Sequence, residues 1–469
     1  MLFSAAIMNP IRLCLLWSAF LASWEGGQAR AEENADAGLT FHAAPSPLAA
    51  GAVVAEWPRF LGPGDDCHSV EKPLRKAFSE TGPPLVWERT KGNGHPAPVI
   101  VGEHLVFIHE RDGRETVECL HPETGRHHWK VDYPVTIGQS YGIADAPRSS
   151  PVIDAASGLV FTLGVRSDLL AISLDTGKIV WQKNLLRELG DSPFFFGCGS
   201  CPLVQGGLLV VNIGSHGACV VAFDVKTGDL RWKSAHEWNG SYASPIAATL
   251  HGRPRILVFA GGMTDPPTGG LICLDPGTGR IDSSIPWRTG MFASVLAASP
   301  VPAGQDRVFV TEDYGKGGLM VRYDEAFQAT PAWEAPRFGC QMQTPVFHEG
   351  HVYGLAGSAG DLVCYEAATG RLLWSEGFQG LTATWQGKEI RVNLGRGSLM
   401  AVDGAFLCLG ESGTLLWLDL SPGGAKILAK AQLFYAPETW ALPALRHGLL
   451  YVNQNTQGAR ILCYDLRGQ

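Results

Sequence analysis

Short apolar runs alternate with glycine- and proline-rich turns along most of the chain. Each unit of the pattern opens with a small residue, often before a proline, as in SPVIDAASGLVFTLG from Ser150 and CPLVQGGLLVVNIG from Cys201. Proline can begin a strand, because its missing N–H is tolerated there. Two apolar runs joined by a turn, followed by a third and a fourth, predict a four-stranded antiparallel meander.

A threonine-glycine turn followed by tryptophan ends most of these units. The five clear copies are CLHPETGRHHW, AISLDTGKIVW, AFDVKTGDLRW, CLDPGTGRIDSSIPW and CYEAATGRLLW, which begin at Cys119, Ala171, Ala222, Cys273 and Cys364. Degraded copies begin at Arg322 and Trp417, and a truncated copy begins at Cys463. The eight starts lie 42 to 53 residues apart. This period is typical of the blades of a β-propeller.

The tryptophan of each unit has a predicted structural role. A glycine takes the positive-φ position of the short turn, and the tryptophan four residues later falls on the fourth strand. There its ring, which buries about 150–250 Å², is expected to fill the wedge between two radiating sheets. Seven tryptophans are assigned to this position: Trp87, Trp129, Trp181, Trp232, Trp287, Trp333 and Trp374.

The two ends of the repeat complete one another. Trp87 follows no threonine-glycine turn, and the final CYDLRGQ has no tryptophan after it. We therefore predict an all-β fold, an eight-bladed β-propeller of four-stranded antiparallel blades. The strand near Trp87 completes the C-terminal blade and closes the ring, which removes the exposed edges of a linear array.

The N-terminal residues divide into three segments before the propeller of residues 85–469. Residues 1–31 read as a cleavable signal peptide, with the apolar stretch LCLLWSAFLASW and a small-x-small site at Ala29-Arg30-Ala31; a membrane anchor is the alternative. Cys14 lies too early for a lipid-attachment site, so we expect a periplasmic or secreted protein without a membrane span. Residues 32–56 are expected to form a flexible leader rich in alanine and proline. Residues 57–84 are expected to be irregular but ordered against the ring, with Asp65-Asp66 in a solvated turn.

The net charge and the placement of the cysteines indicate what the protein binds and whether it depends on disulfides. The net charge of −8 argues against nucleic-acid binding. Eleven cysteines in an exported chain suggest disulfides, but Cys119, Cys273, Cys364 and Cys463 share a repeat position with alanines and read as tightly buried strand residues. Cys198 and Cys201 are interpreted as structural thiols or a local disulfide, with a redox pair as the alternative.

The repeat resembles the pyrroloquinoline-quinone-like (PQQ-like) β-propeller family through the pattern Ala/Cys-x-Asp-x-x-Thr-Gly-x-x-x-Trp over nearly all of residues 85–469. That resemblance implies one of two functions. One branch contains periplasmic dehydrogenases with PQQ and calcium at the axis, and the other contains non-catalytic, BamB-like assembly scaffolds. The leader and WPRFLGP also look like exported single-propeller proteins of planctomycete-type bacteria.

Few of the residues that the dehydrogenase branch uses to hold its quinone and calcium occur in this sequence. The adjacent cysteine pair common beside the quinone is missing, and Asp145, Glu312 and Asp313 do not form the dense oxygen cluster that calcium needs. No covalent haem, nucleophile-elbow or Walker motif is present. We therefore predict no catalytic residue, no metal ligand and no cofactor, and keep PQQ with calcium as the alternative.

The loops that lead into the innermost strands are the candidate binding surface. They present Arg148, Tyr242, Gln343, Arg396 and Trp440, each one to three residues before a strand. The alternative is that these residues only cap the axial channel and bond loop backbones. The leading interpretation is an exported, non-catalytic scaffold that binds an envelope protein or a ligand. The alternatives are a PQQ-dependent dehydrogenase of alcohols or sugars, and a polysaccharide-binding module that uses Trp238, Trp385 and Trp440.

Overall fold

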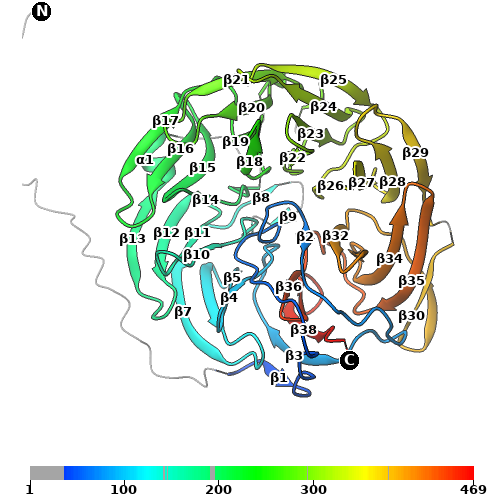
Figure 1. The fold of residues 1–469 in the computed structure, drawn as a ribbon. Helices are drawn as coiled ribbons and strands as arrows, with labels where there is room; N and C mark the ends of the chain where they lie inside the picture. Colours follow the sequence, from blue (N-terminus) through cyan, green and yellow to red (C-terminus); the bar gives the residue numbers. More distant parts are fainter. Residues whose placement is uncertain are drawn as a thin grey trace, which may run out of the picture. The chain divides into compact units, whose positions relative to one another are not determined.

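Eight antiparallel sheets radiate from one axis and close into the predicted ring (Figure 1). The structure is a computed structural model that describes residues 36–140, 143–144, 146–190, 196–262, 264–292, 294–378 and 380–468. The expected signal peptide, residues 1–31, lies outside the described residues. Within the described residues, no helix is long and apolar enough to cross a membrane.

The strands of each blade follow chain order from the axis outwards. In blades 1 to 4 they are β4 (Val99–Val101), β5 (His104–Arg111), β6 (Arg114–Leu120) and β7 (His127–Pro134); β10 (Val152–Asp154), β11 (Leu159–Leu163), β12 (Asp168–Ser173) and β13 (Ile179–Asn184); β14 (Leu203–Gln205), β15 (Leu208–Ser215), β16 (Ala218–Asp224) and β17 (Leu230–Ser234); β18 (Ile246–Leu250), β19 (Arg253–Ala260), β20 (Gly270–Leu274) and β21 (Ile281–Pro286).

Blades 5 to 7 continue the same order, with short elements in some of the connections. Their strands are β22 (Val301–Pro302), β23 (Arg307–Glu312), β24 (Gly317–Tyr323) and β25 (Ala329–Ala335); β26 (Val346–His348), β27 (His351–Ala356), β28 (Asp361–Glu366) and β29 (Leu372–Glu376); β32 (Ser398–Val402), β33 (Ala405–Leu409), β34 (Thr414–Ser421) and β35 (Gly424–Gln432). Between blades lie the hairpins β8 (Gln139–Ser140) with β9 (Ile143–Ala144) and β30 (Thr382–Trp385) with β31 (Lys388–Arg391), and the short helix α1 (Leu185–Leu189).

Blade 8 confirms the predicted ring closure. Its inner strands β36 (Ala444–Arg446), β37 (Leu449–Gln454) and β38 (Arg460–Asp465) come from the C-terminus, and its fourth strand β3 (Leu85–Thr90) comes from the N-terminal part. Trp87 stands opposite Cys463, the same pairing that joins Trp129 to Cys119 in blade 1. The truncated last repeat therefore takes its missing tryptophan from the start of the propeller.

The stretch expected to be a flexible leader is ordered in the part that the structure describes. β1 (Leu39–Phe41) pairs with β3 as a fifth strand outside blade 8. Further along, the Ser46 N–H donates to Asp465 at 2.7 Å, and Glu56 forms an ion pair with Arg446 at 3.0 Å. The alanine- and proline-rich pattern did not reveal these contacts, because they are made by backbone groups and isolated charges.

Each slot tryptophan locks one blade to the next. The indole N–H donates to a carbonyl in the turn before the neighbouring blade's fourth strand, for example from Trp87 to Pro122 at 2.8 Å and from Trp129 to Leu174 at 2.7 Å. The turn glycine lies against the same ring, since a Cβ added at Gly177 would come within 2.8 Å of Trp129. The glycine is thus required both by its φ of 69° and by this close approach.

The assignments of Trp287 and Arg322 to the repeat are wrong. Ser283 pairs with Cys273 in the blade 4 slot, and its Oγ donates to Phe327 of blade 5 at 2.7 Å. Ser283 lies ten residues after Cys273, the spacing that also separates Trp129 from Cys119, so serine replaces tryptophan in this slot and Trp287 lies beyond the end of β21. In blade 5 it is the buried Met320, two residues before Arg322, that pairs with Trp333.

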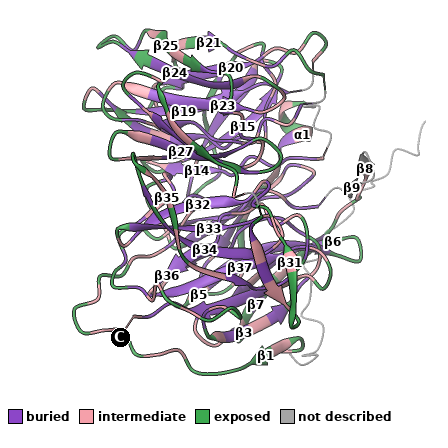
Figure 2. Cartoon of the chain, turned by 90° about the vertical axis from the view of Figure 1, so that its right-hand side faces the viewer, coloured by how far each residue is buried: buried purple, intermediate pink, exposed green. Residues whose placement is uncertain are grey.

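Buried residues fill the blades throughout the ring (Figure 2), and Glu115 is one of the charged groups among them. Glu115 lies on β6 of blade 1 and accepts a hydrogen bond from the backbone N–H of Val165 of blade 2 at 2.8 Å. Burial raises the pKa of its carboxyl from 4.5 to about 7. The folded protein therefore holds a proton that the unfolded chain releases.

The free energy of unfolding is expected to fall as the pH rises from about 4.5 to about 7, because the folded state binds more protons than the unfolded state in that range. Urea unfolding at half-unit pH steps measures this slope. Glu115→Gln should flatten it, since the amide does not titrate. An identical pH profile in the variant would show that Glu115 does not titrate in this way.

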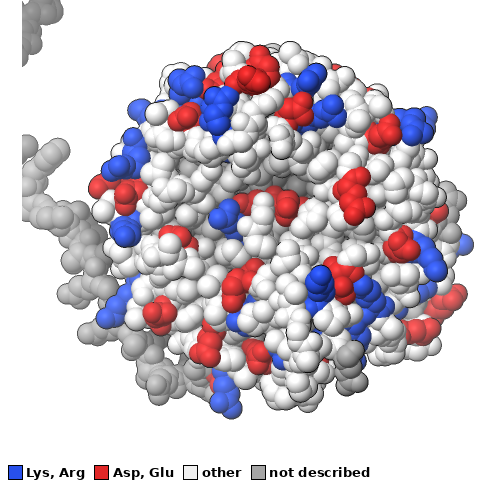
Figure 3. All heavy atoms as spheres, viewed as in Figure 1, with Lys and Arg blue, Asp and Glu red and all other residues white. Residues whose placement is uncertain are grey.

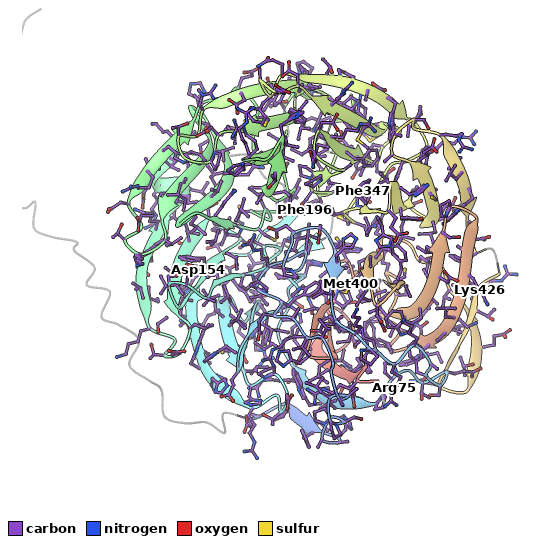
Figure 4. The ribbon with its side chains drawn as sticks, viewed as in Figure 1. Arg75, Asp154, Phe196, Phe347, Met400 and Lys426 are labelled. Atoms are coloured by element: carbon purple, nitrogen blue, oxygen red, sulfur yellow. The ribbon has the colours of Figure 1, made fainter. Side chains whose placement is uncertain are left out.

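The N-terminal segment of residues 57–69 closes the axial channel instead of lying only against the ring. The backbone N–H of Trp57 donates to the Ile100 carbonyl of blade 1 at 2.9 Å, and the Pro58 carbonyl accepts from the Ile153 N–H of blade 2 at 2.9 Å. Its end, β2 (His68–Ser69), pairs in parallel with β32 of blade 7. Figures 1 and 4 show this segment crossing the centre of the ring, beside the labelled Met400 of β32 in Figure 4.

Asp65 lies within residues 57–69, here called the plug segment, and is buried. The expected solvated turn is therefore wrong for this residue. Its carboxylate forms an ion pair with Arg59 at 2.7 Å, while burial raises its pKa to about 6.

On the face of the ring seen in Figure 3, lysine and arginine are interspersed with aspartate and glutamate. This face therefore carries no large patch of positive or of negative charge.

Candidate binding site at the ring axis

A belt of small polar side chains follows the axis from blade 2 to blade 6, just before the innermost strands. The residue before the strand-opening proline donates its backbone N–H to the side chain at the same position in the next blade. The four consecutive bonds run from Ser150 to Cys201 at 3.2 Å, Cys201 to Ser244 at 3.0 Å, Ser244 to Ser299 at 3.1 Å, and Ser299 to Thr344 at 3.0 Å. These bonds explain why a small polar residue precedes proline in so many copies of the repeat.

Cys201 is therefore one member of this belt. Cys201 and Cys198 are free and buried, as are all the cysteines that the structure describes. Burial raises the pKa of the Cys198 thiol to about 12 and also raises the pKa of Cys201. Redox-active thiols are exposed and have lowered pKa values, so this geometry supports the structural interpretation of the pair.

Cys201→Ser is expected to change the free energy of unfolding by less than about 1 kcal/mol, because serine already accepts the same bond at positions 244 and 299. Cys201→Val, whose side chain has no hydrogen-bond acceptor, should lower the free energy of unfolding by about 1–3 kcal/mol. Urea unfolding of the two variants checks this. Equal losses in both would argue against the belt.

The connections from each outer strand to the next inner strand share one face of the ring, here called the connection face. On it, the residue three positions before each strand-opening proline lines an axial pocket of about 110 Å³. The pocket takes one such residue from each of seven blades: His95, Arg148, Gly199, Tyr242, Ala297, Met342 and Trp440. Phe60 of the plug segment also lines it, together with Phe196, which Figure 4 shows close to the ring axis.

Three of the five residues selected from sequence, Arg148, Tyr242 and Trp440, line this pocket. Gln343 does not. It is buried, accepts from the Leu355 N–H at 2.8 Å and donates to the Thr344 carbonyl at 3.2 Å, as the backbone-capping alternative expected. Arg396 lies beside the pocket in an ion pair with Glu411 at 3.3 Å.

Sequence reasoning missed His95, Gly199, Ala297 and Met342 because it selected large polar residues. Aligning the repeats on their strand-opening prolines, and selecting the residue three positions before each proline whatever its type, would have found all four. Phe60 and Phe196 carried no such signal, because they belong to non-repeating segments.

One wall of the pocket is held in place by contacts from two blades. Arg148 Nη1 donates to the Phe196 carbonyl at 2.9 Å, and the Phe196 N–H donates to the Tyr242 hydroxyl at 3.1 Å. The Arg148 guanidinium also lies 5.1 Å from the centre of the Phe196 ring, a cation–π contact. This aromatic wall is therefore positioned before any ligand arrives.

The opposite wall is equally constrained. The Trp440 ring stacks on His95 with centroids 4.8 Å apart and planes 9° apart, and its N–H donates to Glu411 at 2.7 Å. Burial lowers the pKa of His95 well below 6.5, so this imidazole is neutral at pH 7. The wall presents aromatic surface without a charge.

The lining of the pocket does not fit a quinone held with calcium. The described residues that line it include no carboxylate, whereas calcium takes six to eight oxygen ligands. The volume is well below the roughly 300–1,000 Å³ usual for cofactor sites. Glu312 is buried in an ion pair with Arg288, Asp145 lies outside the described residues, and no cluster of three potential metal ligands occurs in the described part of the chain.

The tryptophans considered for polysaccharide binding do not form a shared platform. Trp238 is buried against His236, with ring centroids 4.2 Å apart. Trp385 lies on the β30–β31 hairpin and packs against the core, and Trp440 lines the axial pocket. Sugar-binding tryptophans need an exposed face, so this arrangement gives no support to that alternative.

The connection face also exposes large apolar side chains. Met291 and Phe292, in the connection from blade 4 to blade 5, are 51% and 55% exposed, and Tyr435, in the connection from blade 7 to blade 8, is 49% exposed. Val295 and Ala297, which follow Phe292 in the same connection, line the axial pocket. Large apolar side chains exposed on one face beside a pocket are a feature of interaction surfaces.

Comparisons with known proteins place these features in a family context. The family model described as outer membrane protein assembly factor BamB matches residues 113–376 and 267–469. A protein of that name from Burkholderia pseudomallei (strain K96243) is 24% identical over 321 residues, which cover 66% of this chain and 73% of that protein.

Two solved structures share the fold. BamB from Moraxella catarrhalis superposes with a TM-score of 0.55 at 15% identity, over 82% of this chain and 98% of that one. Quinohemoprotein alcohol dehydrogenase from Comamonas testosteroni superposes with a TM-score of 0.56 at 12% identity, over 88% of this chain and 81% of that one. At such low identity, the two superpositions establish only the propeller fold.

Proposed function

Because the chain belongs to the outer membrane protein assembly factor BamB family, we propose that it is an exported, non-catalytic scaffold that binds an envelope protein through its connection face. The family membership supports a propeller scaffold, and the name of the Burkholderia relative supports a partner in the envelope. The finer assignment, to this face and to a protein partner, depends on the residues of the chain itself.

The observation that carries this proposal is the exposure of Met291, Phe292 and Tyr435 on two connections of the same face. Aromatic residues and methionine are enriched in protein–protein interfaces. The connections are anchored on a closed ring, so binding to them requires little ordering of the scaffold. The PQQ-dependent dehydrogenase is not favoured, because the pocket lining provides neither the volume nor the carboxylate oxygens for quinone and calcium.

Site-specific photocrosslinking tests the proposal. A photoreactive phenylalanine analogue at position 292 is expected to give a discrete adduct with an envelope protein in cells that produce the full chain. The matched control carries the analogue at Leu428, which is 42% exposed on the outer strand β35. It should give no such adduct.

Adducts of equal yield at both positions would mean non-specific contact and would contradict a binding surface on the connection face. The absence of an adduct at positions 291, 292 and 435 alike would contradict the proposed function itself. Both outcomes are scored by mass spectrometry of the purified adduct, which identifies the partner and its cellular compartment together.

A further inference from the structure

We propose that the axial pocket is a socket for one aromatic side chain of the protein partner. This inference rests on the proposed function, because it names the chemical group by which that partner would be anchored. It assigns to the pocket a phenylalanine or tyrosine ring projecting from the partner's surface.

The size of the pocket selects a single ring. Its volume is about 110 Å³, and a cavity of about 150 Å³ lined by apolar side chains takes up one benzene molecule. A tricyclic ligand does not fit, and a small aliphatic side chain would leave empty space. Empty space along the lining forfeits dispersion contacts, so a ring that fills the pocket binds best.

The lining matches the faces and edges of an aromatic ring. Phe60, Phe196, Tyr242 and Trp440 contribute aromatic surface from four different segments, and Met342 adds a thioether. Aromatic pairs gain about 0.5–1.5 kcal/mol beyond their area burial, and sulfur–aromatic contacts are also favourable. Several such contacts around one socket make a ring a better occupant than an aliphatic group of equal volume.

Charge on the lining disfavours a basic anchor group. Arg148 places a cation in one wall, and the described lining residues carry no carboxylate. A lysine or arginine side chain would therefore meet like charge, whereas the negative face of an aromatic ring is attracted to a guanidinium. His95 is neutral at pH 7 and adds no charge on the opposite wall.

The socket is continuous with the proposed interaction surface. Val295 and Ala297 line it, and they follow the exposed Met291 and Phe292 in one connection. Interfaces commonly concentrate their affinity in an aromatic anchor buried in a pocket, surrounded by weaker apolar contacts that exclude water. A free small molecule would use the socket but would leave these exposed neighbours uncovered.

The first arm of the test fills the socket. Ala297→Phe introduces a ring from blade 5 into the pocket and should reduce the yield of the adduct formed at position 292 at least fivefold. Leu428→Phe, which adds a ring on β35, should leave that yield unchanged. If Ala297→Phe lowers the melting temperature by more than a few degrees, Met342→Trp replaces it and fills the pocket from blade 6.

The second arm uses p-cresol, which carries the ring of a tyrosine side chain, with cyclohexylmethanol as the non-aromatic match. In saturation-transfer NMR with the purified full chain, p-cresol is expected to show a signal at least fivefold stronger than cyclohexylmethanol. Ala297→Phe should abolish the difference between the two compounds.

The outcomes separate the two proposals. An unchanged adduct yield in Ala297→Phe, or equal p-cresol signals in wild type and that variant, would overturn the socket while leaving the connection-face function standing. Failure of the wild-type protein to form any adduct would overturn the proposed function. The p-cresol comparison would still decide whether the pocket selects aromatic rings.

Discussion

Trp87→Ala is expected to lower the free energy of unfolding by about 3–5 kcal/mol. Trp87 is fully buried on β3, pairs opposite Cys463, and donates its indole N–H to Pro122 of blade 1 at 2.8 Å. The residue thus joins the N-terminal strand to blade 8, and blade 8 to blade 1. Its loss weakens the closure of the whole ring.

Urea unfolding followed by circular dichroism measures this loss. The matched control is Trp374→Ala, which removes the same slot residue from blade 6, where the ring is only half-buried. It should destabilise the protein less, because less apolar surface is lost and no chain terminus is joined there. A smaller loss for Trp87→Ala than for Trp374→Ala would contradict the closure by β3.

Glu312→Ala is expected to lower the free energy of unfolding by a similar amount, about 3–5 kcal/mol, because it leaves a buried cation without its partner. Glu312 on β23 forms an ion pair with Arg288, and both side chains are almost completely buried. Glu312 also accepts a hydrogen bond from the Thr289 N–H at 2.9 Å. Burial lowers the pKa of Arg288 to about 10, so it remains charged at pH 7.

The control for this pair is Asp306→Ala, which breaks the solvent-exposed ion pair between Asp306 and Arg322 at 3.0 Å. Exposed pairs contribute about 0–1 kcal/mol, so the variant should unfold almost as the wild type does. Thermal and urea unfolding of both variants provide the comparison. Equal losses would mean that the Arg288–Glu312 pair is hydrated and contributes as little as a surface pair.

The repeat allowed the ring to be predicted from sequence, because one local rule recurs in most blades. A glycine turn, a small buried residue and a tryptophan opposite it have fixed spacings, so their positions in the sequence translate directly into strand pairing. The rule failed in blade 4, where serine replaces tryptophan at the same spacing. Ser283 stands opposite Cys273 and donates its hydroxyl to Phe327 of blade 5, so Trp287 is not the slot residue.

The candidate site could be predicted only in part. Arg148, Tyr242 and Trp440 were found because the repeat places them at the starts of inner strands. Gln343 lies one residue too close to its strand-opening proline and turns its amide onto neighbouring backbone groups, whereas Met342 holds the pocket position. A shift of one residue changes the direction of a side chain, so choosing residues by type, without aligning the repeats, selected the wrong neighbour.

The closure of the channel by residues 57–69 lies beyond what the sequence pattern reveals. This segment has neither periodicity nor a repeat, and Trp57, Leu61 and Cys67 are buried by contacts with inner strands that follow it in the chain. Such contacts are long-range and unique to this chain.

Calorimetric titration of the purified protein with pyrroloquinoline quinone in the presence of calcium tests most directly whether this propeller is a scaffold or a dehydrogenase. The small axial pocket, with no carboxylate among its described lining residues, predicts no saturable heat at any quinone concentration that stays soluble. Saturable one-to-one binding would contradict the scaffold and would make the quinone-dependent dehydrogenase the better account.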